Sequence, residues 1–138
     1  MLQYIEKNPT PKEFNYISQK TGNVIRDENI ISEAFENTLY SISVYDGDKI
    51  VGYGRLVGDK TMVIYLQSIM VIPEYQRQGI GTEIINRLLT KVKEYKKKSS
   101  ELRCYLFSCK GKETLYKKFG FVTRPNDEYG AGMMYKWE

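Results

Sequence analysis

The strongest constraint on the fold is a change in hydrophobic spacing between residues 72 and 80. Residues 62–72 are apolar on both alternating faces, interrupted only by Gln67 and Ser68, which is typical of an interior strand covered on both sides. From Gly79 onward, apolar residues recur every three or four positions, as on the buried face of a long helix: Ile80, Ile84, Ile85, Leu88, Leu89, Val92 and Tyr95. The chain must therefore pack a long helix on a sheet.

Two shorter helices are predicted before this strand. Thr10 caps the first, which begins at Pro11 and ends near Thr21, and Asp27 caps the second. Their predicted inward-facing residues are Phe14 and Ile17 on the first helix and Ile30, Ile31, Ala34 and Phe35 on the second.

Alternating and β-branched segments predict the strands. Residues 39–45 and 49–57 form an antiparallel hairpin around the turn at 46–48. The C-terminal part is predicted to hold a strand at 102–107, a short helix at 113–119, and terminal strands at 121–123 and 133–137. No linker or repeat divides the chain, so we expect one domain over residues 1–138: an α/β (α+β) fold with a mixed, mostly antiparallel sheet flanked by helices.

The chain contains no histidine, which excludes Ser-His-Asp and Cys-His catalysis and histidine-ligated metal sites. Cys104 and Cys109 are too few for a four-cysteine cluster, so we expect no metal. Any proton transfer falls to Asp, Glu, Tyr, Cys, Lys, water or the substrate. With no signal-like start and no apolar span of about 20 residues, we expect a cytoplasmic protein with reduced thiols and no membrane partner.

The charge balance of 21 basic to 17 acidic residues gives a net charge of +4, a mild preference for an anionic partner. Nucleic acid is not expected, because Glu94 interrupts the basic run at 91–98 and its one aromatic residue, Tyr95, belongs to the predicted apolar face of the helix. The three lysines at 96–98 are interpreted as the solvated end of a helix.

The loop between the buried strand and the long helix is the candidate anion site. Gly79 and Gly81 open the helix and Arg77 adds positive charge, and glycine lets a phosphate approach the unpaired helix-start amides. No Walker motif is present, and the glycines at 52, 54 and 58 have the wrong spacing for a dinucleotide fingerprint. From these residues alone, a tight helix start without a ligand remains an equally good interpretation.

The context extends the pattern. Gln76-x-x-Gly79-x-Gly81 after an apolar strand resembles the signature of the GCN5-related N-acetyltransferases, the GNAT superfamily. Residues 115–121, Leu-Tyr-Lys-Lys-Phe-Gly-Phe, resemble the late helix-to-strand motif of that family, about 35 residues further on. The resemblance covers the chain from Leu39 onward and implies acetyl-CoA as co-substrate.

The resemblance also implies roles for individual positions. Backbone amides of the loop would bind the CoA pyrophosphate at Gln76, Arg77, Gln78, Gly79, Ile80, Gly81 and Thr82. Ile69, Met70 and Val71 would pair with the pantetheine arm, and a backbone N–H near Met70 would polarise the thioester carbonyl. Tyr116 matches the frequent general acid of the family, and its alternative is a packing role.

Two positions depart from the family pattern. Gln67 stands where many members carry a glutamate base, and Cys109 stands where an asparagine often contacts the cofactor arm. The general base is therefore open, and its candidates are Glu33, Glu36, Asp127, Glu128 and Tyr129. The loop at 126–132 is expected to line the acceptor pocket, whose predicted residues are Glu33, Gln67, Asp127 and Tyr129.

The sequence thus predicts an N-acetyltransferase that acts by direct attack of a primary amine, in a small molecule or a peptide, on acetyl-CoA. The alternative is a non-catalytic acyl-CoA-binding sensor or regulatory module, which the departures at Gln67 and Cys109 motivate. A homodimer is expected only because it is the commonest assembly of soluble proteins. The sequence does not identify the amine.

Overall fold

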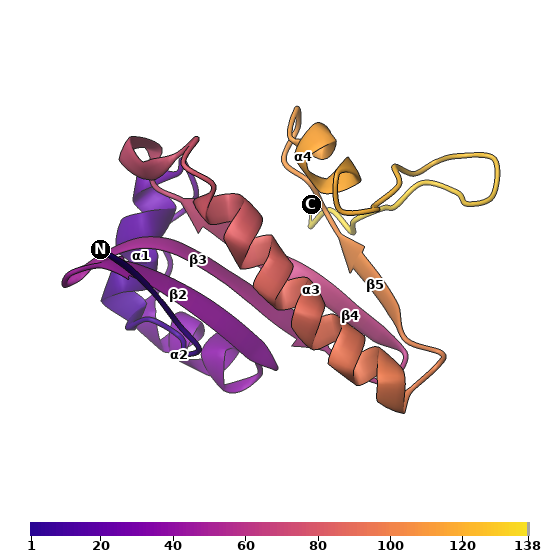
Figure 1. Cartoon of the computed structure of the whole chain (residues 1–138), viewed down its shortest axis with the longest axis horizontal. Coiled ribbons are helices and arrows are strands. Elements are labelled where there is room, and N and C mark those ends of the chain that lie inside the picture. The colour runs from indigo at the N-terminus through magenta and orange to yellow at the C-terminus, as the bar shows by residue number, and fades with distance from the viewer. Residues whose placement is uncertain (138) are drawn as a thin grey trace. The chain divides into compact units, whose positions relative to one another are not determined.

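The computed structural model describes residues 1–137, in two compact units that divide after residue 106. The first unit carries the sheet and three of the helices (Figure 1). Its elements are β1 Leu2–Ile5, α1 Pro11–Lys20, α2 Glu28–Glu36, β2 Tyr40–Asp46, β3 Lys49–Gly58, β4 Val63–Val71, the 3-10 turn η1 Pro73–Tyr75, α3 Ile80–Lys98 and β5 Arg103–Leu106. The second unit contains α4, Glu113–Lys117.

The sheet has the strand order β1-β2-β3-β4-β5. The first three pairs are antiparallel and β4 pairs with β5 in parallel, which confirms the predicted mixed, mostly antiparallel sheet. The sequence analysis missed β1, because four residues are too few to show a period and this strand is defined by its pairing with β2.

Helix α3 covers one face of the sheet, and it lies along the strands in Figure 1. Two glycines of β3 make this close approach possible. A Cβ built on Gly54 would lie 2.6 Å from the Ile84 side chain, and one on Gly52 would lie 3.2 Å from it. Ile84, Ile85 and Leu88 are fully buried, so this face is held by apolar packing.

Helices α1 and α2 cover the opposite face, where the side chains of β3 alternate with the two glycines. The ring of Tyr53 contacts Phe14 of α1 at a centroid distance of 5.7 Å and Phe35 of α2 at 6.0 Å. The Tyr53 hydroxyl donates to Asn8 Oδ1 at 2.7 Å, and the Tyr45 hydroxyl donates to Glu13 Oε1 at 2.9 Å. This face therefore mixes aromatic packing with specific hydrogen bonds.

Both predicted helix caps are confirmed. Thr10 and Glu13 form a reciprocal capping box at the start of α1, and Asp27 accepts from the Asn29 amide at the start of α2. One inward-facing assignment is wrong: Ile30 is 60% exposed, because its neighbour Ile31 takes the buried position of α2.

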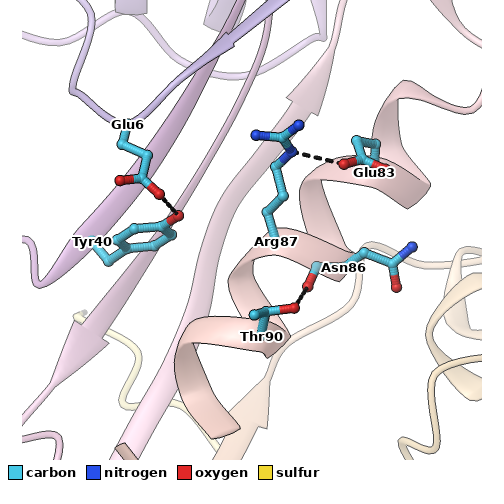
Figure 2. A network of polar contacts seen from close by, with 6 residues as sticks. All are labelled: Glu6, Tyr40, Glu83, Asn86, Arg87 and Thr90. Atoms are coloured by element: carbon cyan, nitrogen blue, oxygen red, sulfur yellow. Dashed lines mark hydrogen bonds and ion pairs between the residues drawn. The ribbon is translucent and has the colours of Figure 1, made fainter. Parts of the chain in front are cut away.

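The edge of the sheet near α3 is held by polar contacts (Figure 2). The Tyr40 hydroxyl donates to Glu6 Oε2 at 2.5 Å, and Arg87 Nε donates to Glu83 Oε2 at 2.7 Å. The Arg87 guanidinium also lies 4.7 Å from the ring centroid of Tyr4. The contact between Arg87 and Tyr4 joins β1 to α3, the helix that carries the candidate anion site.

The two terminal strands are wrong predictions. Residues 121–123 and 133–137 have no strand structure in the described part of the chain. A strand exists only through a ladder with a neighbour, and β-favouring residues such as Val122 and Trp137 do not supply one by themselves. The prediction of a single domain over residues 1–138 stays a prediction.

Candidate functional site

A bulge interrupts β4 in its second half. Tyr53 pairs with Met70 and Arg55 pairs with Gln67, so two residues of β4, Ser68 and Ile69, lie opposite Gly54 alone. Ser68 has a φ of 57°, a left-handed value that is uncommon for a residue with a side chain. A bulge removes the extra residue from the ladder and frees its backbone polar groups for another partner.

The second half of β4 also extends beyond β5, the strand on its other side. The parallel register joins Val63 to Arg103 and ends where Leu66 meets Leu106, the last residue of β5. Residues 67–71 therefore continue past the end of β5. This is the stretch to which the sequence analysis assigned the pantetheine arm and the oxyanion donor.

The Met70 side chain holds residues 67–71 against the end of α1. It is buried, and its Sδ accepts from Ser18 Oγ at 3.9 Å, Thr21 Oγ1 at 3.4 Å and Asn23 Nδ2 at 3.6 Å. All three donors lie at or just after the end of α1. The backbone around Met70 is thus held in place while its side chain is occupied on the α1 side.

The loop that follows presents backbone amides. Arg77 and Gly79 both have left-handed backbones, with φ of 65° and 84°. Gly79 is the N-cap of α3 and supplies no side-chain hydrogen bond to the first amides, which also have no intrahelical acceptor. A Cβ on Gly81 would meet only the Val71 side chain, at 3.9 Å. The start of a 19-residue helix is therefore open to a negatively charged group.

The nearest carboxylates of this region are paired elsewhere. Glu83 binds Arg87, Glu74 lies 3.9 Å from Lys20, and Asp46 accepts a short hydrogen bond from Tyr75. Residues 76–82 themselves contain no acidic side chain and one arginine. A pyrophosphate fits this loop, because the loop offers amides and positive charge and no competing anion.

In the second unit, Tyr116 of α4 is half-buried and its ring packs edge-on against Phe121 at a centroid distance of 6.2 Å. Its carbonyl accepts from the Phe119 and Phe121 amides at 3.0 and 3.3 Å. Burial raises the pKa of Tyr116, and the charge that Cys109 can carry raises it further. The phenol therefore stays protonated at neutral pH and can act as a proton donor.

Comparison with known proteins decides the family. The sequence profile of the acetyltransferase (GNAT) domain matches residues 8–135, which is nearly the whole chain. The chain belongs to the GNAT acetyltransferase family. The predicted family is thereby confirmed.

Individual relatives agree. An uncharacterized ycf52-like N-acetyltransferase from Prochlorococcus marinus is 26% identical over 117 residues, which are 82% of this chain and 63% of that protein. The chloroplastic GCN5-related N-acetyltransferase 3 of Arabidopsis thaliana is 31% identical over 68 residues, 49% of this chain and 28% of its own length. The matched region thus spans less than two thirds of either curated relative.

A crystal structure confirms the fold. A protein of unknown function and probable acetyltransferase from meticillin-resistant Staphylococcus aureus superposes with a TM-score of 0.87 at 25% identity. The match covers 99% of this chain and 100% of that one. The GNAT fold with its five-stranded sheet is therefore the fold of this chain.

The remaining predicted site residues lie in three places. Gln67 is on β4, half-buried, on the α1–α2 side of the sheet opposite Arg55. Glu33 and Glu36 are exposed on α2. In the second unit, Cys109 is exposed and has a free thiol. The Arg124 guanidinium carbon lies 5.0 Å from the ring centroid of Tyr129. A hollow in this unit is lined by Lys117, Phe121, Val122, Thr123, Asn126, Asp127 and Glu128.

Within residues 1–137, no three His, Cys, Asp or Glu side chains gather so as to hold a metal ion, and no helix is long and apolar enough to cross a membrane. The sequence analysis passed over Arg55, the one charged side chain inside the apolar run of β3. A single charged residue inside the apolar run at 50–57 is the signal in the sequence that could have identified Arg55.

Proposed function

We propose that this GNAT chain transfers the acetyl group of acetyl-CoA to a primary amine, carried by a small molecule or a peptide, with both substrates bound at once. The observation that best supports the proposal is the open start of α3 beside the bulged end of β4. The first suits a pyrophosphate, and in the second the bulge takes Ser68 and Ile69 out of one-to-one pairing, so we assign the carbonyl donor to the backbone there.

In this proposal the amine nitrogen forms a bond to the acetyl carbon, the carbon–sulfur bond breaks, and the ammonium proton leaves to water or a base. The freed backbone N–H near Met70 donates to the carbonyl oxygen as its negative charge develops. Tyr116 gives its proton to the departing thiolate and recovers one from solvent. The phenol is neutral at neutral pH, so its proton is present when the thiolate leaves, although burial raises the pKa and makes Tyr116 a weaker acid than a free tyrosine.

Because β4 carries Gln67 where many other family members carry a glutamate, we propose that water or dissolved base removes the proton from the amine. The amide of Gln67 can hydrogen-bond to water but does not accept a proton from the amine. The rate should therefore rise with pH as more of the amine becomes unprotonated. The free thiols of Cys104 and Cys109 support a reducing, cytoplasmic setting for this activity.

The first experiment measures release of free CoA from acetyl-CoA against a panel of amines and peptides. Gly81→Asp places a carboxylate in the proposed pyrophosphate site, where a side chain has room, so the KM for acetyl-CoA should rise at least about tenfold. Ser100→Asp, at the exposed far end of α3, adds the same charge and should leave that KM unchanged. Equal KM values in the two variants would contradict the placement.

Tyr116→Phe tests the general acid. We expect kcat to fall about 100-fold, the low end for such a group, because a thiolate is a fair leaving group by itself. The KM for acetyl-CoA should change little. Full activity of this variant up to alkaline pH would remove Tyr116 from the mechanism. Binding of acetyl-CoA with no CoA release for any amine would favour the non-catalytic sensor instead.

A further inference from the structure

Arg55 lies on β3, directly opposite Gln67 and next to the bulge of β4. Its side chain is half-buried on the α1–α2 side of the sheet. Its Nε donates to Ser68 Oγ at 3.4 Å, and its Nη1 donates to Thr38 Oγ1 at 3.1 Å. Both acceptors are neutral hydroxyls, and a guanidinium has five N–H donors, so most of its hydrogen-bonding capacity is left.

The charge of Arg55 is also left without a counter-ion. No ion pair in the described part of the chain involves Arg55, and neither glutamate of α2 that we considered as a base contacts it. Burial lowers the pKa of Arg55; Tyr53 acts in the opposite direction, and the positive charge of Arg26 lowers the pKa again. Because Arg55 feels the positive charge of Arg26 and has no carboxylate partner, its charged form is unfavourable at this half-buried position until an anion binds.

Arg26, whose charge acts on Arg55, lies in the loop between α1 and α2, and its guanidinium donates only to the Val24 carbonyl, at 3.5 Å, among the described residues. The Asn15 side chain of α1 donates to the Arg26 carbonyl at 2.8 Å and accepts from the Arg26 amide at 3.0 Å. This two-sided contact fixes the loop between α1 and α2 at the residue that brings its charge toward Arg55. Arg26 itself is exposed and has no carboxylate partner within residues 1–137.

We propose that Arg55, assisted by Arg26, binds an anionic group, a carboxylate or a phosphate, on the acceptor, so that the substrate is an amine that also carries negative charge. This inference rests on the proposed acetyl transfer and specifies its acceptor. Through Ser68 the guanidinium is attached to the bulge, so an anion bound to Arg55 is positioned beside residues 67–71, where the acetyl group is proposed to lie.

The same pair of charges disfavours polycationic acceptors. A polyamine or an aminoglycoside would bring further positive charge against two unpaired arginines. An amino acid, a peptide with a nearby carboxylate, or a phosphorylated amine supplies the missing counter-ion and remains open to attack at its amine.

The test uses matched acceptors that differ only in the anionic group. Each L-amino acid is compared with its amide, and phosphoethanolamine is compared with ethanolamine, by kcat/KM for CoA release. An amino amide has the less basic amine, so more of it is unprotonated at neutral pH and intrinsic reactivity favours the amide. A preference for the acid therefore reports recognition, and the two pairs distinguish carboxylate from phosphate.

Arg55→Gln should reduce kcat/KM for the preferred anionic acceptor about 10- to 100-fold and leave its neutral partner unaffected. The KM for acetyl-CoA should not change, which a merely structural role would not predict. Arg26→Gln, at an exposed position, should give a smaller loss in the same direction without any risk to folding. Lys93→Gln, on the exposed side of α3, removes one positive charge on the other face and is the control.

The inference is overturned if neutral or polycationic amines are acetylated as well as the anionic ones, or if Arg55→Gln lowers kcat/KM equally for both members of each pair. In either case the proposed acetyl transfer stands. Absence of CoA release with every amine, by a chain that binds acetyl-CoA, would instead remove the proposed function and this inference together.

Discussion

The two faces of the sheet in residues 1–106 are packed in different ways. Against α3, the sheet presents glycines and aliphatic side chains, and Ile84 and Leu88 are fully buried there. Against α1 and α2, it presents Tyr45, Tyr53 and Arg55, each of which makes specific hydrogen bonds. The difference indicates two roles: apolar packing on the α3 side stabilises the fold and positions the proposed anion site, and the opposite side holds the polar groups that we propose for recognition of the acceptor.

The largest effect on stability is expected on the α3 side. Gly54→Ala places a Cβ 2.6 Å from Ile84 Cγ2 and 3.2 Å from Leu88 Cδ1, so α3 must shift or its side chains must leave their rotamers. We expect a loss of about 1–3 kcal/mol in the free energy of unfolding, measured by urea denaturation. Gly81→Ala, whose Cβ meets nothing closer than 3.9 Å, is the matched control and should keep or gain stability. Equal stability of the two variants would contradict the close packing of this face.

A pH-dependent effect is expected on the opposite side. Burial, followed by the hydrogen bond to Glu13, raises the pKa of Tyr45 to about 12. The unfolded chain releases this proton near pH 10, whereas the folded chain keeps it, so the contribution is complete below pH 10 and is lost as the pH rises toward 12. Unfolding free energies measured between pH 9 and 11.5 should fall, and the fall should be shallower in Tyr45→Phe. An identical slope in the variant would show that this phenol does not couple to folding.

The smallest effect is expected at the edge of the sheet. Arg87→Gln removes a half-exposed pair with Glu83, four residues apart on α3, and the contact with the Tyr4 ring. The expected loss is about 0.3–0.5 kcal/mol, and it should shrink in high salt. A loss above about 2 kcal/mol would mean that β1 depends on this contact far more than a half-exposed ion pair allows.

The features that sequence reasoning recovered depend on local chemistry or on a long period. The Thr10 and Asp27 caps follow from the residue types that satisfy helix amides, and α3 follows from 19 residues of regular spacing. The glycines at 79 and 81 identified the open helix start, because a left-handed N-cap and an exposed amide both favour residues without a side chain.

The features that it missed depend on pairing across the chain. β1 exists through β2, and the bulge appears only when β3 and β4 are aligned, since Ser68 gives no sign of a left-handed backbone. The sequence around Arg55 does not indicate that its guanidinium contacts Ser68 of the bulge and Thr38, just after α2. Conversely, residues 121–123 and 133–137 favour strands by composition but have no ladder.

The most direct test of the difference between the faces is a single ratio, kcat/KM for an L-amino acid divided by kcat/KM for its amide, measured in Arg55→Gln and in Ile85→Val, a fully buried position of α3, at a temperature where both are folded. We predict that the ratio falls at least about tenfold in Arg55→Gln and stays at the wild-type value in Ile85→Val, despite the loss of stability there. A ratio that is unchanged in both variants, or that falls equally in both, would contradict the account.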